Sequence, residues 1–446
     1  MTNLIIFLVG LAIMLVMMMK TKLGPFACML IASLGIGMAC GLGSAKTIDT
    51  IVTGFAGTCK SIGLLVIFGT ILGIYLEKSK ACLRIATTLL GIVGSKNSGM
   101  ALAITGYVVA IPVFSDVALV LLTPLIKSVA KKSGKSPYAL GTVTACSLLS
   151  TNAFVAPPPA PLAVIAVLGL DIGTSIMWGI PAALFITICV WLFGEFYLGR
   201  KPESWFTPLE DDHANDIQAI TADDGNMPAF TASMTPIMLP IILILCGSVG
   251  GQILPDGSTV LAVLNFLGDK NIALAFGVVS AILCLARYLP DKDRYAPMND
   301  ALKISGTIVF ITAAGGALAK IVSATGVGET IANILVASPI PVILIPFLIT
   351  GFSKFAQGSA SVAALLAAGL ALPMCEAGLI TPLEAFLSIS AGSSLGSHVN
   401  NSFTWVYSEF IGCDIKTTLK TLCVGQNIVM SLAGIAATIF ISVIAR

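Results

Sequence analysis

Long apolar runs follow one another along the whole chain, separated by short polar segments or by breaks that contain glycine and proline. A helix that crosses a bilayer needs about 20 mainly apolar residues, with a usable range of about 17–25. In the first half the runs are Leu4–Met19, Leu23–Leu42, Ile62–Leu76, Met100–Ile111, Val117–Val129, Leu140–Val155, Leu162–Leu170 and Ile176–Phe196. In the second half they are Ile237–Ile253, Ile272–Leu289, Ile304–Leu318, Ile331–Phe352, Ser361–Met374 and Thr421–Ala445. The shorter, broken runs are typical of re-entrant hairpins or unwound helices that line a cavity within a membrane.

The composition matches a protein whose solvent is lipid. Of 446 residues, 57% are hydrophobic and 10% are charged, whereas soluble domains carry about 25% charged residues. The net charge of +2 provides no basic field for nucleic acid, which we exclude as a partner. The 11 cysteines are scattered singly through apolar runs, which indicates small membrane-buried side chains rather than disulfides or a metal site.

One polar stretch, residues 200–230, interrupts the apolar pattern. Its seven acidic residues are Glu203, Glu210, Asp211, Asp212, Asp216, Asp223 and Asp224. Charged segments that contain proline and glycine are typical of solvated linkers. We therefore predict three parts: a membrane repeat over residues 1–199, an acidic cytoplasmic linker over residues 200–230, and a second membrane repeat over residues 231–446.

The two halves share landmarks in the same order, which indicates an internal repeat. The segment Gly169-x-Asp171-Ile172-x-Thr174 matches Gly412-x-Asp414-Ile415-x-Thr417. Earlier in each half, Asp116-Val117-Ala118 falls opposite Ser361-Val362-Ala363.

Loop charge predicts that the two repeats have inverted topology. Positively charged loops stay on the cytoplasmic side of a bilayer. One loop of the first half carries four bases, Lys127, Lys131, Lys132 and Lys135, whereas its counterpart over residues 373–378 carries Glu376 and no base. Further bases, Arg287, Lys292, Arg294 and Lys303, mark another cytoplasmic loop. Matching loops of opposite charge then lie on opposite faces, with the linker inside and both termini outside.

Four short segments combine helix breakers with polar groups at membrane depth: residues 111–116, 152–161, 353–361 and 392–402. They form two pairs under the repeat, and interrupted segments in matching positions of two halves mark the binding site of secondary transporters. A break exposes helix N-terminal N–H groups, which bind anions, and Ser or Asn side chains hydrogen-bond hydroxyls. The alternative for each segment is a kink that only packs helices together. No motif of an ATP-driven motor, a cofactor site or a hydrolase accompanies these segments, so we predict neither a cofactor nor an enzyme.

Three ionisable residues near these segments each have two interpretations. Asp116 is a candidate proton carrier, because a carboxylate at the bilayer centre costs roughly 2.5–3.5 kcal/mol; the alternative is an interfacial cap of a helix that starts at Val117. Lys354 could bind a substrate carboxylate or extend to the membrane interface. His398 could titrate near neutral pH or be a hydrogen-bonded structural residue.

Several stretches carry a resemblance to a known family: Phe114-x-Asp116-Val117, Pro157-x-Pro159 through Gly169-x-Asp171-Ile172-Gly173, Ala314-Gly315-Gly316-Ala317, Gln357-Gly358-Ser359-Ala360-Ser361-Val362-Ala363, and Trp405 downstream of Ser402. The sequence resembles the gluconate permease family, within the wider ion transporter superfamily, over nearly the whole chain. This resemblance implies transport of gluconate, a similar hydroxy-acid or D-serine, usually with protons, by a homodimer in the bacterial inner membrane.

The chain departs from the family pattern at two titratable positions. Where Asn152 stands, members usually have His, and where Asn401 stands they usually have Asp. Asp116 and Lys354 fit the pattern. The neutral amides leave Na⁺ open as the coupling ion, with Asn152, Asn401, Ser359 and Ser397 as its expected ligands.

We therefore predict an all-α polytopic membrane protein of two inverted-topology repeats with re-entrant hairpins or broken helices. The expected function is secondary active import of a small organic anion such as gluconate, coupled to H⁺ through Asp116. Alternatives are a D-serine or Na⁺-coupled permease and, from another class, a passive anion channel. The expected substrate-binding residues are Ser115, Asn152, Pro157, Pro159, Lys354, Gln357, Gly358, Ser359, Ser361, Ser397, His398, Asn401 and Ser402.

Overall fold

The computed structural model describes residues 2–21, 23–93, 97–156, 158–208, 227–255, 258–290, 294–327, 330, 340–399 and 401–445. Within these ranges the regular elements are helices. The first half contains α1 (Thr2–Lys20), α2 (Pro25–Ala39), α3 (Ser44–Lys78), α4 (Ala81–Val93), α5 (Ser98–Val109), α6 (Ser115–Ser133), α7 (Pro137–Phe154), α8 (Pro159–Leu168) and α9 (Ile172–Leu192). A π-helical segment, η2 (Phe193–Tyr197), and short 3₁₀ turns, η3 (Leu198–Arg200) and η4 (Glu203–Trp205), follow α9.

The second half contains α11 (Phe230–Ile253), α12 (Thr259–Gly268), α13 (Lys270–Leu285), α14 (Ala296–Ala324), α16 (Leu344–Gln357), α17 (Ala360–Glu376), α18 (Pro382–Gly392), α19 (Ser402–Ile411), α20 (Ile415–Thr418) and α21 (Ser431–Ile444). A 3₁₀ turn, η5 (Ala286–Tyr288), follows α13. Two π-helical segments, η7 (Leu419–Cys423) and η8 (Gly425–Met430), connect α20 to α21.

Five helical stretches in the described part are long and apolar enough to cross a membrane: Ile172–Arg200, Phe230–Gly250, Lys270–Tyr288, Ala296–Ala324 and Ile415–Ile444. The two parts of α3, Ser44–Ser61 and Gly63–Lys78, are bent by 43° and form one further candidate. The predicted all-helical, apolar fold is confirmed for the described residues.

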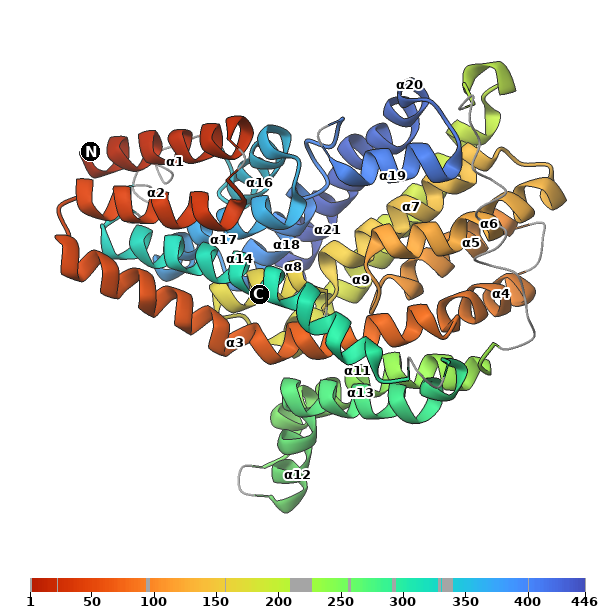
Figure 1. The fold of residues 1–446 in the computed structure, drawn as a ribbon, viewed down its shortest axis with the longest axis horizontal. Helices are drawn as coiled ribbons and strands as arrows, with labels where there is room; N and C mark the ends of the chain where they lie inside the picture. The colour runs from red at the N-terminus through yellow and green to blue at the C-terminus, as the bar shows by residue number, and fades with distance from the viewer. Residues whose placement is uncertain are drawn as a thin grey trace.

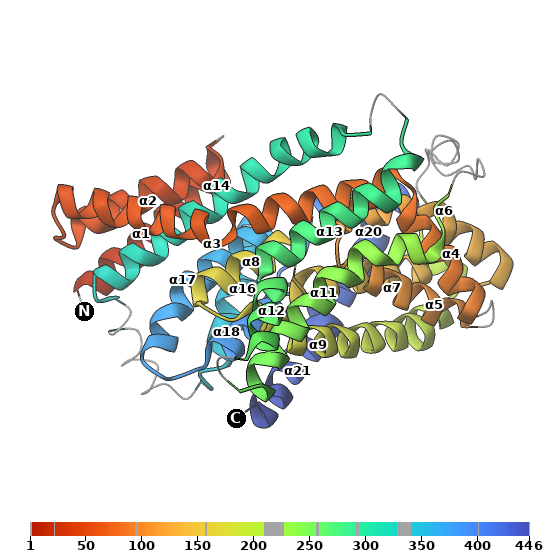
Figure 2. The ribbon, with the colours of Figure 1, turned by 90° about the horizontal axis from the view of Figure 1, so that it is seen from below.

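Helix α3 is longer than the sequence pattern predicts. The apolar run Ile62–Leu76 is only its second part, and the structure continues the helix back to Ser44. That first part carries Lys46, Asp49 and Lys60, which mask it in a hydropathy pattern. Helices α1, α2, α3 and α14 lie side by side at one end of the molecule (Figure 1, Figure 2), so packing against α14 supports the polar part of α3.

The two halves contain matched helix boundaries at the landmarks of the predicted repeat. Helix α6 ends at Gly134, which has φ +67°, and α7 then starts with Ser136 as N-cap and Pro137 in the first turn. Helix α17 is followed by Gly378, which has φ +71°, and α18 starts with Thr381 as N-cap and Pro382 in the first turn.

The second pair of landmarks is matched in the same way. Gly169 and Gly412 adopt left-handed conformations that end α8 and α19. Asp171 and Asp414 then cap the next helices by accepting hydrogen bonds from the backbone N–H groups of Thr174 and Thr417, at 2.7 and 2.8 Å. These two landmarks therefore share a local structure, a left-handed glycine followed by an Asp cap.

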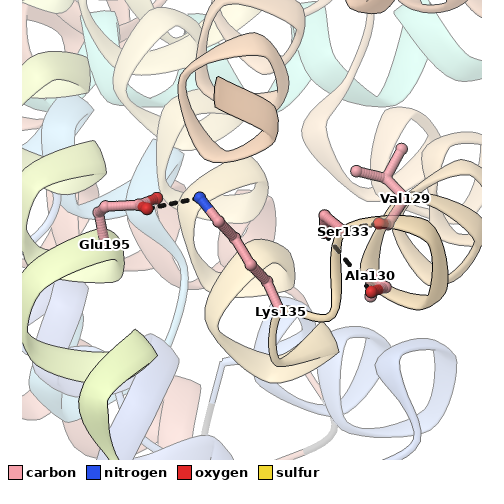
Figure 3. A network of polar contacts seen from close by, with 5 residues as sticks. All are labelled: Val129, Ala130, Ser133, Lys135 and Glu195. Atoms are coloured by element: carbon pink, nitrogen blue, oxygen red, sulfur yellow. Dashed lines mark hydrogen bonds and ion pairs between the residues drawn. The ribbon is translucent and has the colours of Figure 1, made fainter. Parts of the chain in front are cut away.

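Ion pairs and hydrogen bonds hold helix ends in the described part of the chain. The Lys135 ammonium, in the loop before α7, lies 2.5 Å from the Glu195 carboxylate in η2 (Figure 3). The Ser133 hydroxyl donates to the Val129 carbonyl at 2.7 Å in the last turn of α6 (Figure 3). Lys78 and Asp300 form a second ion pair at 2.6 Å, which joins the end of α3 to the start of α14.

The predicted linker is described only at its two ends. Residues 209–226, which hold most of its acidic side chains, lie outside the described residues. At its start, the Thr207 carbonyl accepts from the Asp414 N–H at 3.0 Å, and the Thr207 N–H donates to the Thr417 hydroxyl at 2.9 Å. The first residues of the linker are therefore attached to the turn between α19 and α20.

The crossing of α3 and α14 gives a testable prediction. A Cβ added at Gly54 would lie 2.7 Å from the Gly316 carbonyl oxygen and 2.9 Å from the Ala317 Cα, whereas a Cβ at Gly57 meets nothing within 4 Å. We expect Gly54→Ala to lower the free energy of unfolding by about 1–3 kcal/mol, the usual effect of overpacking. Gly57→Ala should leave it unchanged or raise it, because alanine has the higher helix propensity. Thermal unfolding of the purified variants measures both, and equal midpoints would contradict the close crossing.

Candidate functional site

A cavity of about 360 Å³ lies where the four predicted broken segments meet. Its wall contains residues from the first turns of four helices: Ser115 of α6, Ala160 of α8, Ser361 of α17 and Ser402 of α19. The remaining wall comes from the last turns of α7 and α16, the end of α18, and η8. Its volume falls within the roughly 300–1,000 Å³ range of small-molecule sites.

Four helix N-termini therefore face one cavity. The N-caps of α6, α8, α17 and α19 are Phe114, Pro158, Ser359 and Asn401. The first N–H groups of a helix have no partner within it, and the aligned peptide dipoles give this end a partial positive charge of about half an elementary charge. Four such ends at one cavity favour a bound anion.

Local sequence explains why the helices begin where they do. The Ser359 hydroxyl accepts from the Val362 N–H at 3.3 Å, and the Asn401 carboxamide oxygen accepts from the Phe403 N–H at 3.1 Å. Gly358 ends α16 with φ +83°, a conformation that favours glycine. The Asn152 amide donates to the Val113 carbonyl at 3.2 Å and so joins the break after α5 to the end of α7.

Asp116 occupies the second position of α6, one residue after Ser115, and lines the cavity. The alternative expectation that it caps a helix starting at Val117 is wrong, because α6 already begins at Ser115 and its N-cap is Phe114. Ser361 occupies the equivalent second position of α17. The two residues that the sequence repeat aligns therefore lie at matching helix starts on the same cavity.

Lys354 is buried at the C-terminal end of α16, with 2% of its surface exposed, and it lines the cavity. Its ammonium donates to the Ser393 carbonyl at 2.6 Å and to the Ser397 hydroxyl at 2.5 Å, and it lies 3.5 Å from the Gln426 carboxamide oxygen. These contacts hold a positive charge inside the protein, so the side chain does not extend toward a membrane interface.

Neutral polar groups cover much of the remaining wall. Seven serines line the cavity: Ser115, Ser359, Ser361, Ser390, Ser393, Ser394 and Ser402. Three carboxamides join them, those of Asn152, Asn401 and Gln426. Hydroxyls and carboxamides both donate and accept hydrogen bonds, which suits a ligand that carries several hydroxyl groups.

The structure gathers most of the predicted site residues around this cavity. The residues in its wall are Ser115, Asp116, Asn152, Lys354, Gly358, Ser359, Ser361, Asn401 and Ser402. Pro157 lies outside the described residues. Pro159 is the first residue of α8, and Gln357 is the last residue of α16.

Two predicted residues have other positions. Ser397 is buried, with 1% of its surface exposed, and contacts Lys354 from outside the cavity wall. His398 also lies outside the wall, and its Nε2 is 3.0 Å from the Phe355 carbonyl oxygen while its ring packs against the Phe355 ring.

Sequence reasoning missed Gln426 and its neighbour Asn427. Both belong to η8, within the apolar run that starts at Thr421. The Asn427 side chain accepts from the Ser397 N–H at 2.9 Å and donates to the Ser397 carbonyl at 2.7 Å, which fixes the break between α18 and α19. The sequence did contain a signal for these two residues, since they are adjacent carboxamides inside an otherwise apolar run. Buried polar side chains usually have a hydrogen-bond partner, so such a pair indicates a polar contact inside the protein.

An apolar helical bundle with polar side chains around a cavity at paired helix breaks is the architecture typical of membrane transport proteins. The chain belongs to the GntP permease family, since a family model described as "GntP family permease" matches residues 2–444. The expected resemblance is confirmed, and the protein is a permease rather than an enzyme.

Curated relatives match over almost their whole length. An "Uncharacterized permease" of Haemophilus influenzae is 31% identical over 442 residues, covering 96% of this chain and 90% of the relative. The "High-affinity gluconate transporter" of Escherichia coli is 28% identical and covers 99% of both chains. The "Gnt-II system L-idonate transporter" of Escherichia coli is 28% identical, covering 97% of this chain and 98% of the relative.

A solved structure shares the fold. The YdaH transporter of Alcanivorax borkumensis, whose crystal structure is described as having an unusual topology, superposes with a TM-score of 0.69. The match covers 93% of this chain and 97% of the other at 14% sequence identity. At this identity the likeness concerns the fold alone.

The cap of α19 gives a testable prediction for the site. We expect Asn401→Ala to lower the free energy of unfolding by about 0.5–2 kcal/mol, because the Phe403 N–H loses its acceptor. Asn401→Asp should keep the wild-type midpoint, since a carboxylate caps a helix as well as a carboxamide does. The midpoints are measured by thermal unfolding of ligand-free protein, and an alanine variant as stable as wild type would show that Asn401 does not support the helix start.

Proposed function

We propose that the protein is a secondary active importer of a sugar acid such as gluconate, driven by protons. The observation that carries this proposal is the meeting of four helix N-termini and Lys354 at one cavity. Positive potential suits the carboxylate, and the serines and carboxamides suit the hydroxyl groups of the same molecule. The names of the relatives as gluconate and L-idonate transporters support this substrate class.

The two halves are proposed to be inverted-topology repeats in the bacterial inner membrane. The support is the matched order of breaks, caps and left-handed glycines described above, together with the charges of equivalent loops. Inverted repeats around a central site permit alternating access, in which one part moves against the other. The proposal places both termini outside the cytoplasm and includes a homodimer, which the family resemblance implies.

Asp116 is the proposed proton carrier. It lines the cavity and has no side-chain role as the cap of α6. Protonation of this carboxylate would remove the cost of moving a negative charge through an occluded state and would remove its repulsion of an anionic substrate.

The geometry favours H⁺ over Na⁺ as the coupling ion. Of the four expected Na⁺ ligands, Ser397 accepts a hydrogen bond from the Lys354 ammonium. A sodium ion there would lie beside a like charge. The Ser359 and Asn401 side-chain oxygens already accept hydrogen bonds from helix N–H groups.

One alternative substrate has specific support. The same cavity wall contains a carboxylate, Asp116, and an ammonium, Lys354, and a zwitterion such as D-serine needs one group of each sign. A thermal-shift screen of gluconate, L-idonate, short hydroxy-acids and D-serine on purified protein separates these classes. Stabilisation by D-serine and by none of the acids would replace the sugar-acid proposal.

Counterflow of labelled substrate separates a carrier from a passive channel, because a passive channel shows no counterflow.

Lys354 is expected to contribute affinity for the carboxylate. Lys354→Ala should weaken apparent substrate affinity at least tenfold, because a charge-assisted contact typically contributes about 1.5–3 kcal/mol. Lys132→Ala, a lysine exposed at the end of α6, serves as the control and should transport normally. Uptake is measured at matched membrane expression, and unchanged affinity in the Lys354 variant would remove this residue from the site.

Asp116→Asn should abolish accumulation against a gradient while sparing exchange, since exchange needs no net proton movement. Proteoliposomes with an imposed pH gradient measure accumulation, and preloaded proteoliposomes without a gradient measure exchange. A variant that still concentrates substrate when pH is the sole driving force would show that Asp116 is not the carrier. A wild-type protein that requires Na⁺ and ignores pH would contradict proton coupling altogether.

A further inference from the structure

The cavity wall contains a carboxamide to which the family resemblance and the repeat assign no role. Gln426 belongs to η8, with 1% of its surface exposed, and lines the cavity on the side of Lys354. Its Nε2 is buried and has no hydrogen-bond partner in the described part of the chain. A buried donor without an acceptor costs about 1–3 kcal/mol, and an orphaned donor of this kind in a native protein calls for a functional explanation.

Neighbouring donors fix the orientation of this carboxamide. The Gln426 Oε1 atom lies 3.5 Å from the Lys354 ammonium and accepts a short hydrogen bond from the Ser397 hydroxyl. A lysine ammonium has only donors, so a flipped carboxamide would set Nε2 against Nζ, whereas the Ser397 hydroxyl could pair with either end of the carboxamide. The oxygen therefore faces Lys354 and Ser397, and Nε2 is the atom left for another partner.

A second orphaned polar atom lies in the other half of the same wall. The Ser115 hydroxyl, on α6, is also buried without a partner in the described structure, with 5% of the residue exposed. Ser115 and Gln426 come from different halves of the chain and line one cavity. Two unsatisfied polar groups at one cavity are the pattern expected of a site whose ligand supplies the missing partners.

We propose that the Gln426 Nε2 donates a hydrogen bond to an acceptor oxygen at the carboxylate end of the transported sugar acid. Because Gln426 contacts Lys354, one substrate end meets both the ammonium and the carboxamide. Ser397 is then a positioning residue, since its hydroxyl hydrogen-bonds both the Lys354 ammonium and the Gln426 Oε1 atom and so fixes their relative positions. This inference rests on the proposed function and adds to it a residue that recognises the substrate.

The test measures binding of the sugar acid that stabilises wild-type protein most, starting with gluconate and L-idonate, by isothermal titration calorimetry. Gln426→Met removes the carboxamide at similar side-chain length and should weaken binding about threefold to tenfold, the usual effect of losing one neutral hydrogen bond. Gln426→Glu should weaken it further, because a carboxylate would pair with Lys354 and repel the substrate. Ile428→Met changes a half-exposed side chain of the same π-helical segment and should bind as wild type does.

A double variant separates direct contact from an effect through Lys354. If Gln426 donates to the substrate itself, Gln426→Met should still weaken binding about threefold or more in a Lys354→Ala background. Wild-type affinity in folded Gln426→Met protein, or a loss that disappears in that background, would overturn this inference. Weaker binding by Lys354→Ala alone would then leave the proposed function intact. Failure of any sugar acid to bind wild-type protein would instead overturn the proposed function.

Discussion

The meeting of four helix starts at one cavity is the constraint on which the rest of the structure depends. Each helix start leaves backbone N–H groups without partners, and a membrane interior has no water to satisfy them. The chain meets this requirement in three ways. Ser359 and Asn401 cap two of the starts, Pro158, Pro159 and Pro161 remove N–H groups at a third, and a polar cavity faces all four. Under the proposed function, the same helix starts that need a polar cavity would also attract the substrate anion.

Lys354, a buried lysine in the cavity wall, is held in place by hydrogen bonds. Lys354 is held by the Ser393 carbonyl and the Ser397 hydroxyl, and Ser397 is itself held by both sides of the Asn427 carboxamide. Charged groups buried in protein need such hydrogen bonds to offset the loss of hydration. In the same wall, Asp116 contributes a carboxyl group from the start of α6. The wall therefore contains one basic and one acidic side chain, Lys354 and Asp116.

Much of this could be predicted from the sequence, because glycine, proline and serine act locally. Gly358-Ser359 and the prolines Pro158 and Pro159 lie at helix ends, as their residue types predicted, and the pairing of such breaks between the two halves pointed to this cavity. Gln426 was not predicted as a site residue, because it lies within an apolar run of the sequence. Its π-helical conformation and its proximity to Lys354 arise only in the folded protein. The first part of α3 was not predicted as a helix, because Lys46, Asp49 and Lys60 interrupt the apolar pattern there. Packing against α14 supports this helix in the folded protein. The position of His398 could not be predicted from the sequence either. This residue lies beside Phe355, outside the cavity wall, and its position depends on how the chain turns after Gly396.

The central claim is that one anion binds where the four helix starts meet. A cryo-EM structure of the protein in lipid nanodiscs with saturating gluconate tests it most directly. We expect ligand density within this cavity, with the carboxylate within hydrogen-bond distance of the Lys354 ammonium and the hydroxyl groups against the serines of α17 and α18. Ligand density at another site, with this cavity unoccupied, would contradict it.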